Sequence, residues 1–287
     1  MQVWSSRTWT RWLLSIERPS NLLLLGVFHR GLSTLPPKTV KFVNLGGGTM
    51  NIAGAVAFVT GTNRGIGAQL VKALQVRGAA KIYAASRSGA TTEAGVIHVK
   101  LDITKPDEVT AAATMARDTT LLINNAGVNF NTPLLNPPTV DNARAEMAVN
   151  YFGTLAMCQA FAPILGTNGG GAIVNMLSIL SRVNLPLMGS LCASKAAALS
   201  LTHGVRAQLA QQGTLVIAVM PGAVDTDMTK DFPPPKIPPL EVAKSVLDAI
   251  EAGMEEIYPG DMAQGIAQRL AADPKGVEKE LARYLPG

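Results

Sequence analysis

The chain has 287 residues, enough for one large α/β domain, and a net charge of +5. Its two cysteines, Cys158 and Cys192, exclude a disulfide framework and favour a reducing compartment, and its three histidines form no metal-binding pattern. The excess positive charge lies in residues 1–49, because residues 50–287 carry as many acidic as basic side chains. This neutral domain argues against nucleic-acid binding.

Residues 1–49 differ from the rest of the chain, and we expect them to be a leader or a disordered extension. They contain all three tryptophans, and their apolar run at 22–28 is far shorter than the roughly 20 residues that span a membrane. An arginine-containing, nearly acid-free segment is typical of a mitochondrial transit peptide. Alternatively, the native protein starts at Met50 in the cytoplasm, and the glycine run 46–48 reflects a translated ribosome-binding site.

Residues 55–67, with the sequence AVAFVTGTNRGIG, are the stretch around which we expect the fold to be built. The apolar run 55–59 predicts a buried parallel strand, and apolar residues at helical spacing predict a helix over 68–78. Three glycines lie between them: Gly61, Gly65 and Gly67. A strand, a glycine turn and a helix in this order favour phosphate binding, because glycines let the backbone approach a pyrophosphate at the helix N-terminus.

The second strand, predicted at 81–85, carries the signal for the coenzyme. Arg87 follows it at the place where dinucleotide-binding folds meet the adenosine ribose. An acidic residue there would bind the ribose 2′-hydroxyl, whereas an arginine binds a 2′-phosphate with paired donors. Together with Arg64 in the glycine turn, Arg87 predicts NADP(H), the alternative being two solvated surface arginines.

The remaining elements alternate between strands and helices. The segment 89–95 is too short for a crossover helix and is expected to be a loop. We predict strands at 96–101, 120–123, 172–176, 215–219 and 256–258, helices at 106–117 (with Thr104 as N-cap), 140–165, about 190–212 and 240–252, and a helical tail at 261–287. The proline-rich segment 232–239 is expected to be a stiff loop over the active site. This order predicts a single-domain α/β fold, a Rossmann-type doubly wound parallel sheet over 50–260.

Six motifs in order resemble those of the short-chain dehydrogenase/reductase family. They are T-G-x-x-x-G-I-G at 60–67, Asp102-Ile103, N-N-A-G at 124–127, Asn150 in the long helix, Ser178 with Lys195, and P-G-x-V-x-T at 221–226. The resemblance implies an NADP(H)-binding oxidoreductase of carbonyls or alcohols. The implied coenzyme-binding residues are Gly61, Asn63, Arg64, Gly65, Ile66, Gly67, Arg87, Asp102, Ile103, Asn124, Ala126, Gly127, Lys195, Pro221, Gly222, Val224 and Thr226.

The same resemblance implies the catalytic roles. Ser178 would orient the substrate carbonyl, Asn150 would hold a water of the proton relay, and Lys195 would grip the nicotinamide ribose. The family motif Tyr-x-x-x-Lys places the proton donor thirteen residues after the serine, and that position is Leu191. A leucine has no proton to give, so a loss within the general-acid range of about 10²–10⁴-fold is expected.

A substitute proton donor is hard to find in the sequence. Cys192 is adjacent but points about 100° away on a helix, and Tyr151 lies on another element. A water ordered by Ser178 and Lys195 is the remaining candidate. Two functions therefore stay open: a reductase that is weak or uses a substitute donor, and a non-catalytic NADP(H)-binding protein that acts as a sensor or silent subunit.

The partners follow from the same patterns. Leu185, Leu187 and Met188 favour an apolar carbonyl compound as substrate. No metal, membrane or nucleic acid is expected. The resemblance implies a homodimer or homotetramer that pairs through the helices at 140–165 and 190–212, and we expect it in the cytoplasm, or in mitochondria if residues 1–49 are a transit peptide.

Overall fold

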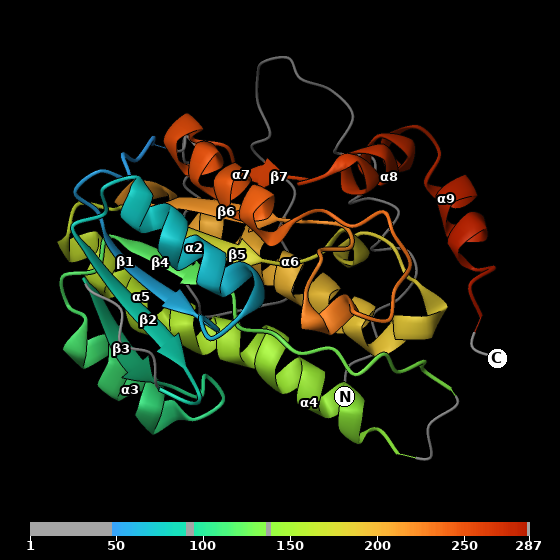
Figure 1. Cartoon of the computed structure of the whole chain (residues 1–287), viewed down its shortest axis with the longest axis horizontal. Coiled ribbons are helices and arrows are strands. Elements are labelled where there is room, and N and C mark those ends of the chain that lie inside the picture. The colour runs from blue at the N-terminus through green and yellow to red at the C-terminus, as the bar shows by residue number, and fades with distance from the viewer. Residues whose placement is uncertain (1–47, 90–94, 136–138, 286–287) are drawn as a thin grey trace, which may run out of the picture. The chain divides into compact units, whose positions relative to one another are not determined.

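The computed structural model describes residues 48–89, 95–135 and 139–285, which all belong to one unit of the chain, residues 43–287. Our predictions for residues 1–47 lie outside the described residues. A seven-stranded parallel sheet in the order β3-β2-β1-β4-β5-β6-β7 forms the centre of this unit (Figure 1). Its strands are β1 (Val56–Thr60), β2 (Lys81–Ser86), β3 (Val96–Lys100), β4 (Leu121–Asn124), β5 (Ala172–Met176), β6 (Leu215–Val219) and β7 (Glu256–Ile257).

Helices cover both faces of the sheet. They are α2 (Gly65–Val76), α3 (Pro106–Met115), α4 (Asp141–Met147), α5 (Thr154–Thr167), α6 (Gly189–Leu209), α7 (Pro239–Ala252), α8 (Asp261–Ala272) and α9 (Pro274–Leu281). One buried cluster joins the sheet to α2 and α7, and a second joins it to α3, α5 and α6. This three-layer arrangement confirms the predicted doubly wound fold.

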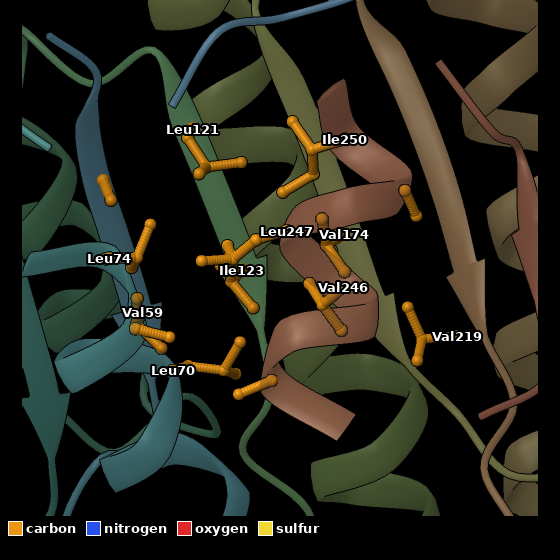
Figure 2. Packing of buried hydrophobic residues seen from close by; sticks show 14 of the residues in the cluster. Val59, Leu70, Leu74, Leu121, Ile123, Val174, Val219, Val246, Leu247 and Ile250 are labelled. Atoms are coloured by element: carbon orange, nitrogen blue, oxygen red, sulfur yellow. The ribbon is translucent and has the colours of Figure 1, made fainter. Parts of the chain in front are cut away.

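The packing beneath α2 and α7 shows why the strand ends are held firmly. Figure 2 shows Leu70 and Leu74 of α2, and Leu247 and Ile250 of α7, above the central strands. All four side chains are fully buried. Because burying a side chain of this size stabilises a protein by roughly 1.5–3 kcal/mol, this layer fixes the sheet from which the site's loops emerge.

One helix start and one helix cap differ from the prediction. Helix α2 begins at Gly65 rather than at residue 68, because the glycine turn itself winds into the first helical turn. Thr104 is not the N-cap of α3, which is Lys105. The amide and hydroxyl of Thr104 instead donate to Asp102 Oδ1, at 3.0 and 2.7 Å. The Thr104 side chain is thus turned toward the carboxylate two residues earlier.

The long helix predicted at 140–165 spans Asp141–Thr167, with a π-helical segment, Ala148–Gly153, between α4 and α5. Such widened turns commonly occur at functional sites. Gly153 allows close packing there, because a Cβ on it would lie 2.6 Å from Ile103 Cγ1. By length and composition alone this 27-residue stretch could cross a membrane. Core helices pass the same test, and this one buries Met157, Phe161 and Leu165 within the domain.

The glycine turn after β1 is clamped to the N-N-A-G turn after β4. The Thr60 hydroxyl accepts hydrogen bonds from the amides of Asn125 and Ala126, both at 3.0 Å. Asn125 Nδ2 donates in return to the carbonyls of Thr60 and Gly61, both at 3.0 Å. A Cβ on Gly61 would lie 2.8 Å from Ala126 Cα, so this glycine also serves the contact between the two turns.

Gly67→Ala is expected to destabilise the domain, although alanine is intrinsically the better helix former. A Cβ at Gly67 would lie 2.1 Å from the Gly61 carbonyl oxygen and 2.6 Å from Asn125 Nδ2. We expect the free energy of unfolding to fall by about 1–3 kcal/mol, the usual range for overpacking, in urea titrations. Gly204→Ala on α6 is the matched control, because its Cβ would meet nothing within 4 Å. A Gly67→Ala variant as stable as this control would contradict the account.

Candidate active site

The predicted site residues gather at one edge of the sheet. Gly61 follows β1, Asn125 follows β4, Ser178 follows β5 and Pro221 follows β6. Because all these strands are parallel, their carboxyl ends lie at the same edge, where open α/β sheets bind ligands. The structure therefore brings the two predicted halves of the site together, while the individual binding roles stay predictions.

The glycine turn offers a ready anion site. Arg64, the N-cap residue of α2, makes no side-chain capping bond, and there is no acidic residue in the first turn. The first amides of α2 thus lack an internal acceptor, and the helix dipole favours negative charge there. Gly65 has a φ of +57°, a conformation that suits glycine. This arrangement fits the pyrophosphate of a dinucleotide.

Arg64 forms an ion pair with an acidic residue, whereas we expected no acid near the site of a 2′-phosphate. Its Nη1 lies 2.9 Å from Asp227 Oδ2, and both side chains are about two-thirds exposed. A Cβ on neighbouring Gly65 would lie 3.2 Å from Thr226 Cγ2. The glycine turn therefore touches the end of the P-G-x-V-x-T segment.

Arg87 is exposed at the end of β2, and no ion pair of its guanidinium occurs within the described residues. Its charge nevertheless acts on Asp102, which follows the neighbouring strand β3. Burial alone would raise the pKa of Asp102, but hydrogen bonds from Thr104 and the charges of Lys105 and Arg87 hold that pKa below its usual value. Arg87 therefore lies where a phosphate on the adenosine ribose could reach it.

Two predicted coenzyme residues bury their side chains in the core. Ile103 is 7% exposed and packs against Gly153. Asn124 is 4% exposed, and its Nδ2 donates to Asn175 Oδ1 at 2.9 Å. The side chains of both residues are therefore held inside the domain, and their coenzyme-binding roles stay predictions.

Asn124 begins a polar row that the sequence analysis missed. Asn175 Nδ2 donates to Thr202 Oγ1 at 3.0 Å, and Thr202 donates to the Ala198 carbonyl at 2.7 Å. The row joins β4, β5 and α6 inside the domain. Asparagines at paired positions of two neighbouring buried strands, Asn124 opposite Asn175, are the signal that could have revealed it.

The expected catalytic groups lie around the N-N-A-G turn. Asn150 is 2% exposed and binds Val128 twice, accepting from its amide and donating to its carbonyl, each at 3.0 Å. A Cβ on Gly127 would lie 3.2 Å from Asn150 Oδ1 and 3.5 Å from Lys195 Nζ. Lys195 Nζ donates to the Met176 carbonyl at 2.8 Å. Burial lowers the pKa of Lys195 to about 8.

Ser178 is held in an extended conformation at the end of β5. Its hydroxyl oxygen accepts from the Leu180 amide at 3.1 Å, which leaves the hydroxyl hydrogen available to a substrate oxygen. The next amide, of Ile179, donates to the Pro221 carbonyl at 2.9 Å and ties this serine to the P-G-x-V-x-T segment.

Leu191 lies in the first turn of α6, one turn before Lys195, and is 6% exposed. Its side chain is therefore packed inside the domain. Cys192 offers no alternative acid, because its sulfur is buried and accepts from the Leu185 amide at 3.3 Å. Burial raises the pKa of this thiol.

The loop after β6 closes on itself. Val224 pairs with Ile237, and Lys236 Nζ donates to the carbonyls of Thr229 and Lys230 at 2.7 and 3.3 Å. The structure also places Met262 of α8 against Gly222, because a Cβ there would lie 3.1 Å from the methionine sulfur. Lys236 and Met262 are site neighbours that the sequence analysis did not identify. Within the described residues, no three His, Cys, Asp or Glu side chains group as metal ligands.

Comparisons with known proteins agree with this geometry. Residues 55–236 match a family model described as short chain dehydrogenase. The chain is 33% identical over 192 residues to 2-(R)-hydroxypropyl-CoM dehydrogenase of Xanthobacter autotrophicus, covering 61% of this chain and 76% of that protein. It is 36% identical over 190 residues to galactitol 2-dehydrogenase (L-tagatose-forming) of Cereibacter sphaeroides, covering 61% and 74%.

A solved structure is more similar still. A short chain dehydrogenase from Burkholderia cenocepacia J2315, determined in complex with NADP, is 52% identical, with a TM-score of 0.78, and the match covers 83% of this chain and all of that one. The family model spans well over half of the sequence and includes the glycine turn, Ser178 and Lys195. The chain therefore belongs to the short chain dehydrogenase family, whose members are oxidoreductases that act on alcohols and ketones.

Proposed function

We propose that this protein is an NADP(H)-dependent reductase of carbonyl compounds, or a dehydrogenase of the corresponding alcohols. The observation that carries the proposal is the convergence of an uncapped helix N-terminus, Ser178 and Lys195 at the carboxyl edge of one parallel sheet. When bound, NADPH supplies a hydride to the carbonyl carbon. The Ser178 hydroxyl would then donate a hydrogen bond to the carbonyl oxygen as negative charge develops there.

The preference for NADP(H) rests on charge at the ribose end of the site. Arg87 is exposed beside the end of β3, and the residues that directly follow β2, 87–89, include no acid. The relative that is 52% identical was solved with NADP. Arg64 contributes less than Arg87, because Asp227 already neutralises part of its charge.

Arg87→Asp is expected to weaken NADPH binding by tenfold or more and to leave NADH binding unchanged or improved, since loss of a charge-assisted hydrogen bond costs about 1.5–3 kcal/mol. Titration calorimetry with both coenzymes measures this. Arg117→Asp is the matched control, because Arg117 is exposed just before β4, at the opposite edge of the sheet. Equal affinity of the unaltered protein for NADPH and NADH would refute the preference.

The proton for the product oxygen needs a source, since position 191 has none to offer. Lys195 is one helical turn away, and burial lowers its pKa to about 8, so its ammonium is a stronger acid than an ordinary lysine. We infer that Lys195, together with Ser178, orders a water that passes the proton to the product oxygen. This route supports turnover at a reduced rate.

This route predicts a pH dependence. The ammonium of Lys195 is the acid, so the rate of carbonyl reduction at saturating NADPH should be highest below pH 8 and fall as the pH rises through about 8. Stopped-flow measurement of NADPH oxidation between pH 6 and 10, with NADPH affinity measured at each pH, separates this effect from coenzyme loss. A rate that stays level to pH 10 would show that Lys195 is not the acid.

Leu191→Tyr is expected to raise carbonyl reduction by about 10²–10⁴-fold in kcat. The phenol would lie one turn before Lys195 on the same helix, and the nearby ammonium would lower its pKa. Because Leu191 is 6% exposed, the larger ring must find room, so Leu191→Phe is the matched control for size without the hydroxyl. A tyrosine variant that folds and binds NADPH but is no faster than the phenylalanine variant would contradict the prediction.

The alternative function is that of a non-catalytic NADP(H)-binding protein, a sensor or silent subunit. The specific observation in its favour is the packed leucine at position 191. A screen of NADPH oxidation against a panel of carbonyl compounds distinguishes the two. Tight NADPH binding without turnover, in both the unaltered protein and Leu191→Tyr, would favour the alternative.

We also propose the type of substrate, the oligomeric state and the cellular location of this protein. Leu187 and Met188 favour a substrate with an apolar group beside the carbonyl. A homodimer or homotetramer would cover Phe152, which is 58% exposed on the long helix. Ultracentrifugation tests the assembly. We place the protein in the cytoplasm, or in mitochondria if residues 1–49 are a transit peptide.

A further inference from the structure

Three polar side chains on one face of the long helix bind a single segment, residues 128–132. Asn150 binds the backbone of Val128. Glu146 Oε1 accepts from the Phe130 amide at 2.8 Å. Asn142 Nδ2 donates to Thr132 Oγ1 at 3.0 Å. We call these three residues, Asn142, Glu146 and Asn150, the helix ladder.

The spacing of the ladder has a simple geometric basis. Its members are four residues apart, which advances about 6 Å along a helix. Their partners are two residues apart in the segment, which advances roughly 6.5 Å in an extended chain. The two repeats match between Val128 and Phe130, and the segment runs alongside the helix in the opposite direction. Asn131, with a φ of +51°, departs from the extended conformation before the third rung. The ladder residues also become more buried along the helix, since Asn142 is exposed whereas Glu146 and Asn150 are buried.

Glu146 is the unusual member of the ladder. It is 0% exposed, although it carries a carboxylate. Its second oxygen, Oε2, is buried without a hydrogen-bond partner in the part of the chain that the structure describes. An apolar side chain would avoid the cost of burying a carboxylate. The contact that offsets part of this cost is the charge-assisted hydrogen bond to Phe130.

The segment that Glu146 holds also faces the first turn of α6. The amide and hydroxyl of Ser190 both donate to the Thr132 carbonyl, at 3.3 and 3.2 Å. On the alternate residues of the segment, Asn129 Nδ2 donates to Asn131 Oδ1 at 2.8 Å and to the Met188 sulfur at 3.4 Å. The ladder therefore determines where Asn129 lies against Met188, just before the turn that carries Leu191.

We propose that Glu146 is a positioning residue for the substrate side of the site: by accepting the Phe130 amide, it fixes residues 128–132 between the long helix and α6. The charge of Glu146 does not contribute to the lowered pKa of Lys195, which is due to burial. Its carboxylate contacts the segment directly, and its charge also raises the pKa of the Cys192 thiol. The consequence for substrate binding rests on the proposed function.

The test compares four full-length proteins: the unaltered chain, Glu146→Ala, Glu146→Gln and Asp141→Ala. Glutamine keeps the acceptor oxygen, and Asp141→Ala removes an exposed carboxylate from the same helix outside the ladder. Hydrogen exchange of residues 128–132 should rise by about tenfold or more in Glu146→Ala, and stay near the unaltered rate in the other two. NADPH affinity, measured by calorimetry, should change less than twofold in all of them.

The kinetic arm uses 4-nitrobenzaldehyde and other small activated carbonyls. Glu146→Ala should raise KM for the carbonyl at least fivefold and leave KM for NADPH unchanged, with rescue by Glu146→Gln. An unchanged carbonyl KM would overturn the proposal. So would unaltered exchange in Glu146→Ala, a matching loss of NADPH affinity, or a glutamine variant that behaves like alanine.

The experiments also distinguish a failure of the Glu146→Ala variant to fold from a failure of the proposed function. If Glu146→Ala fails to fold, Asn142→Ala removes the exposed rung, and exchange of Thr132 must rise for the ladder to stand. If neither the unaltered protein nor Leu191→Tyr reduces any probe while NADPH still binds, the proposed function fails. The exchange and NADPH measurements then still decide whether Glu146 positions the segment.

Discussion

The clamp between the glycine turn and the N-N-A-G turn is the contact on which the site depends. The Thr60 hydroxyl accepts hydrogen bonds from two backbone amides, and the side-chain amide of Asn125 donates hydrogen bonds to two backbone carbonyls. These four hydrogen bonds join the ends of β1 and β4. Between these two strands the strand order reverses, because β2 and β3 lie on one side of them and β5 to β7 on the other. Glycine at positions 61 and 67 is required because the two backbones approach too closely for a side chain. The glycine turn and the N-N-A-G turn therefore share one rigid edge of the sheet, the edge where open α/β sheets bind ligands.

The two halves of the site differ in how much chemistry they retain. The coenzyme half has an uncapped helix N-terminus and an exposed Arg87. The catalytic half keeps Ser178 and a lysine of lowered pKa, but a packed leucine occupies the donor position. We therefore expect coenzyme binding and turnover to be separable in this chain. The family assignment fixes the class of reaction and leaves its rate open.

The sequence predicted the fold well because its signals are local. Apolar runs of about five residues gave the strands 172–176 and 215–219 as the structure has them, and the glycine turn gave the edge where the site lies. What it could not predict depends on partners distant in the chain. Asp227 pairs with Arg64, which lies 163 residues earlier in the chain. The side chain of Asn124 points into the domain because it donates a hydrogen bond to Asn175 on the neighbouring strand. Spacing also says nothing about whether a residue such as Leu191 faces a cleft or the core.

The pairing of Arg64 with Asp227 has a consequence for evolution within such a site. Both partners are largely solvated, so their attraction contributes little to stability, about 0–1 kcal/mol. Asp227 nonetheless places a negative charge near any anion that Arg64 would receive, and the penalty grows with each charge on that anion. A neutral residue at 227 would cost the fold almost nothing and sharpen discrimination between phosphorylated and unphosphorylated ribose. Coenzyme selectivity in this scaffold can therefore change through a substitution at position 227, after the P-G-x-V-x-T segment, while the glycine turn itself stays the same.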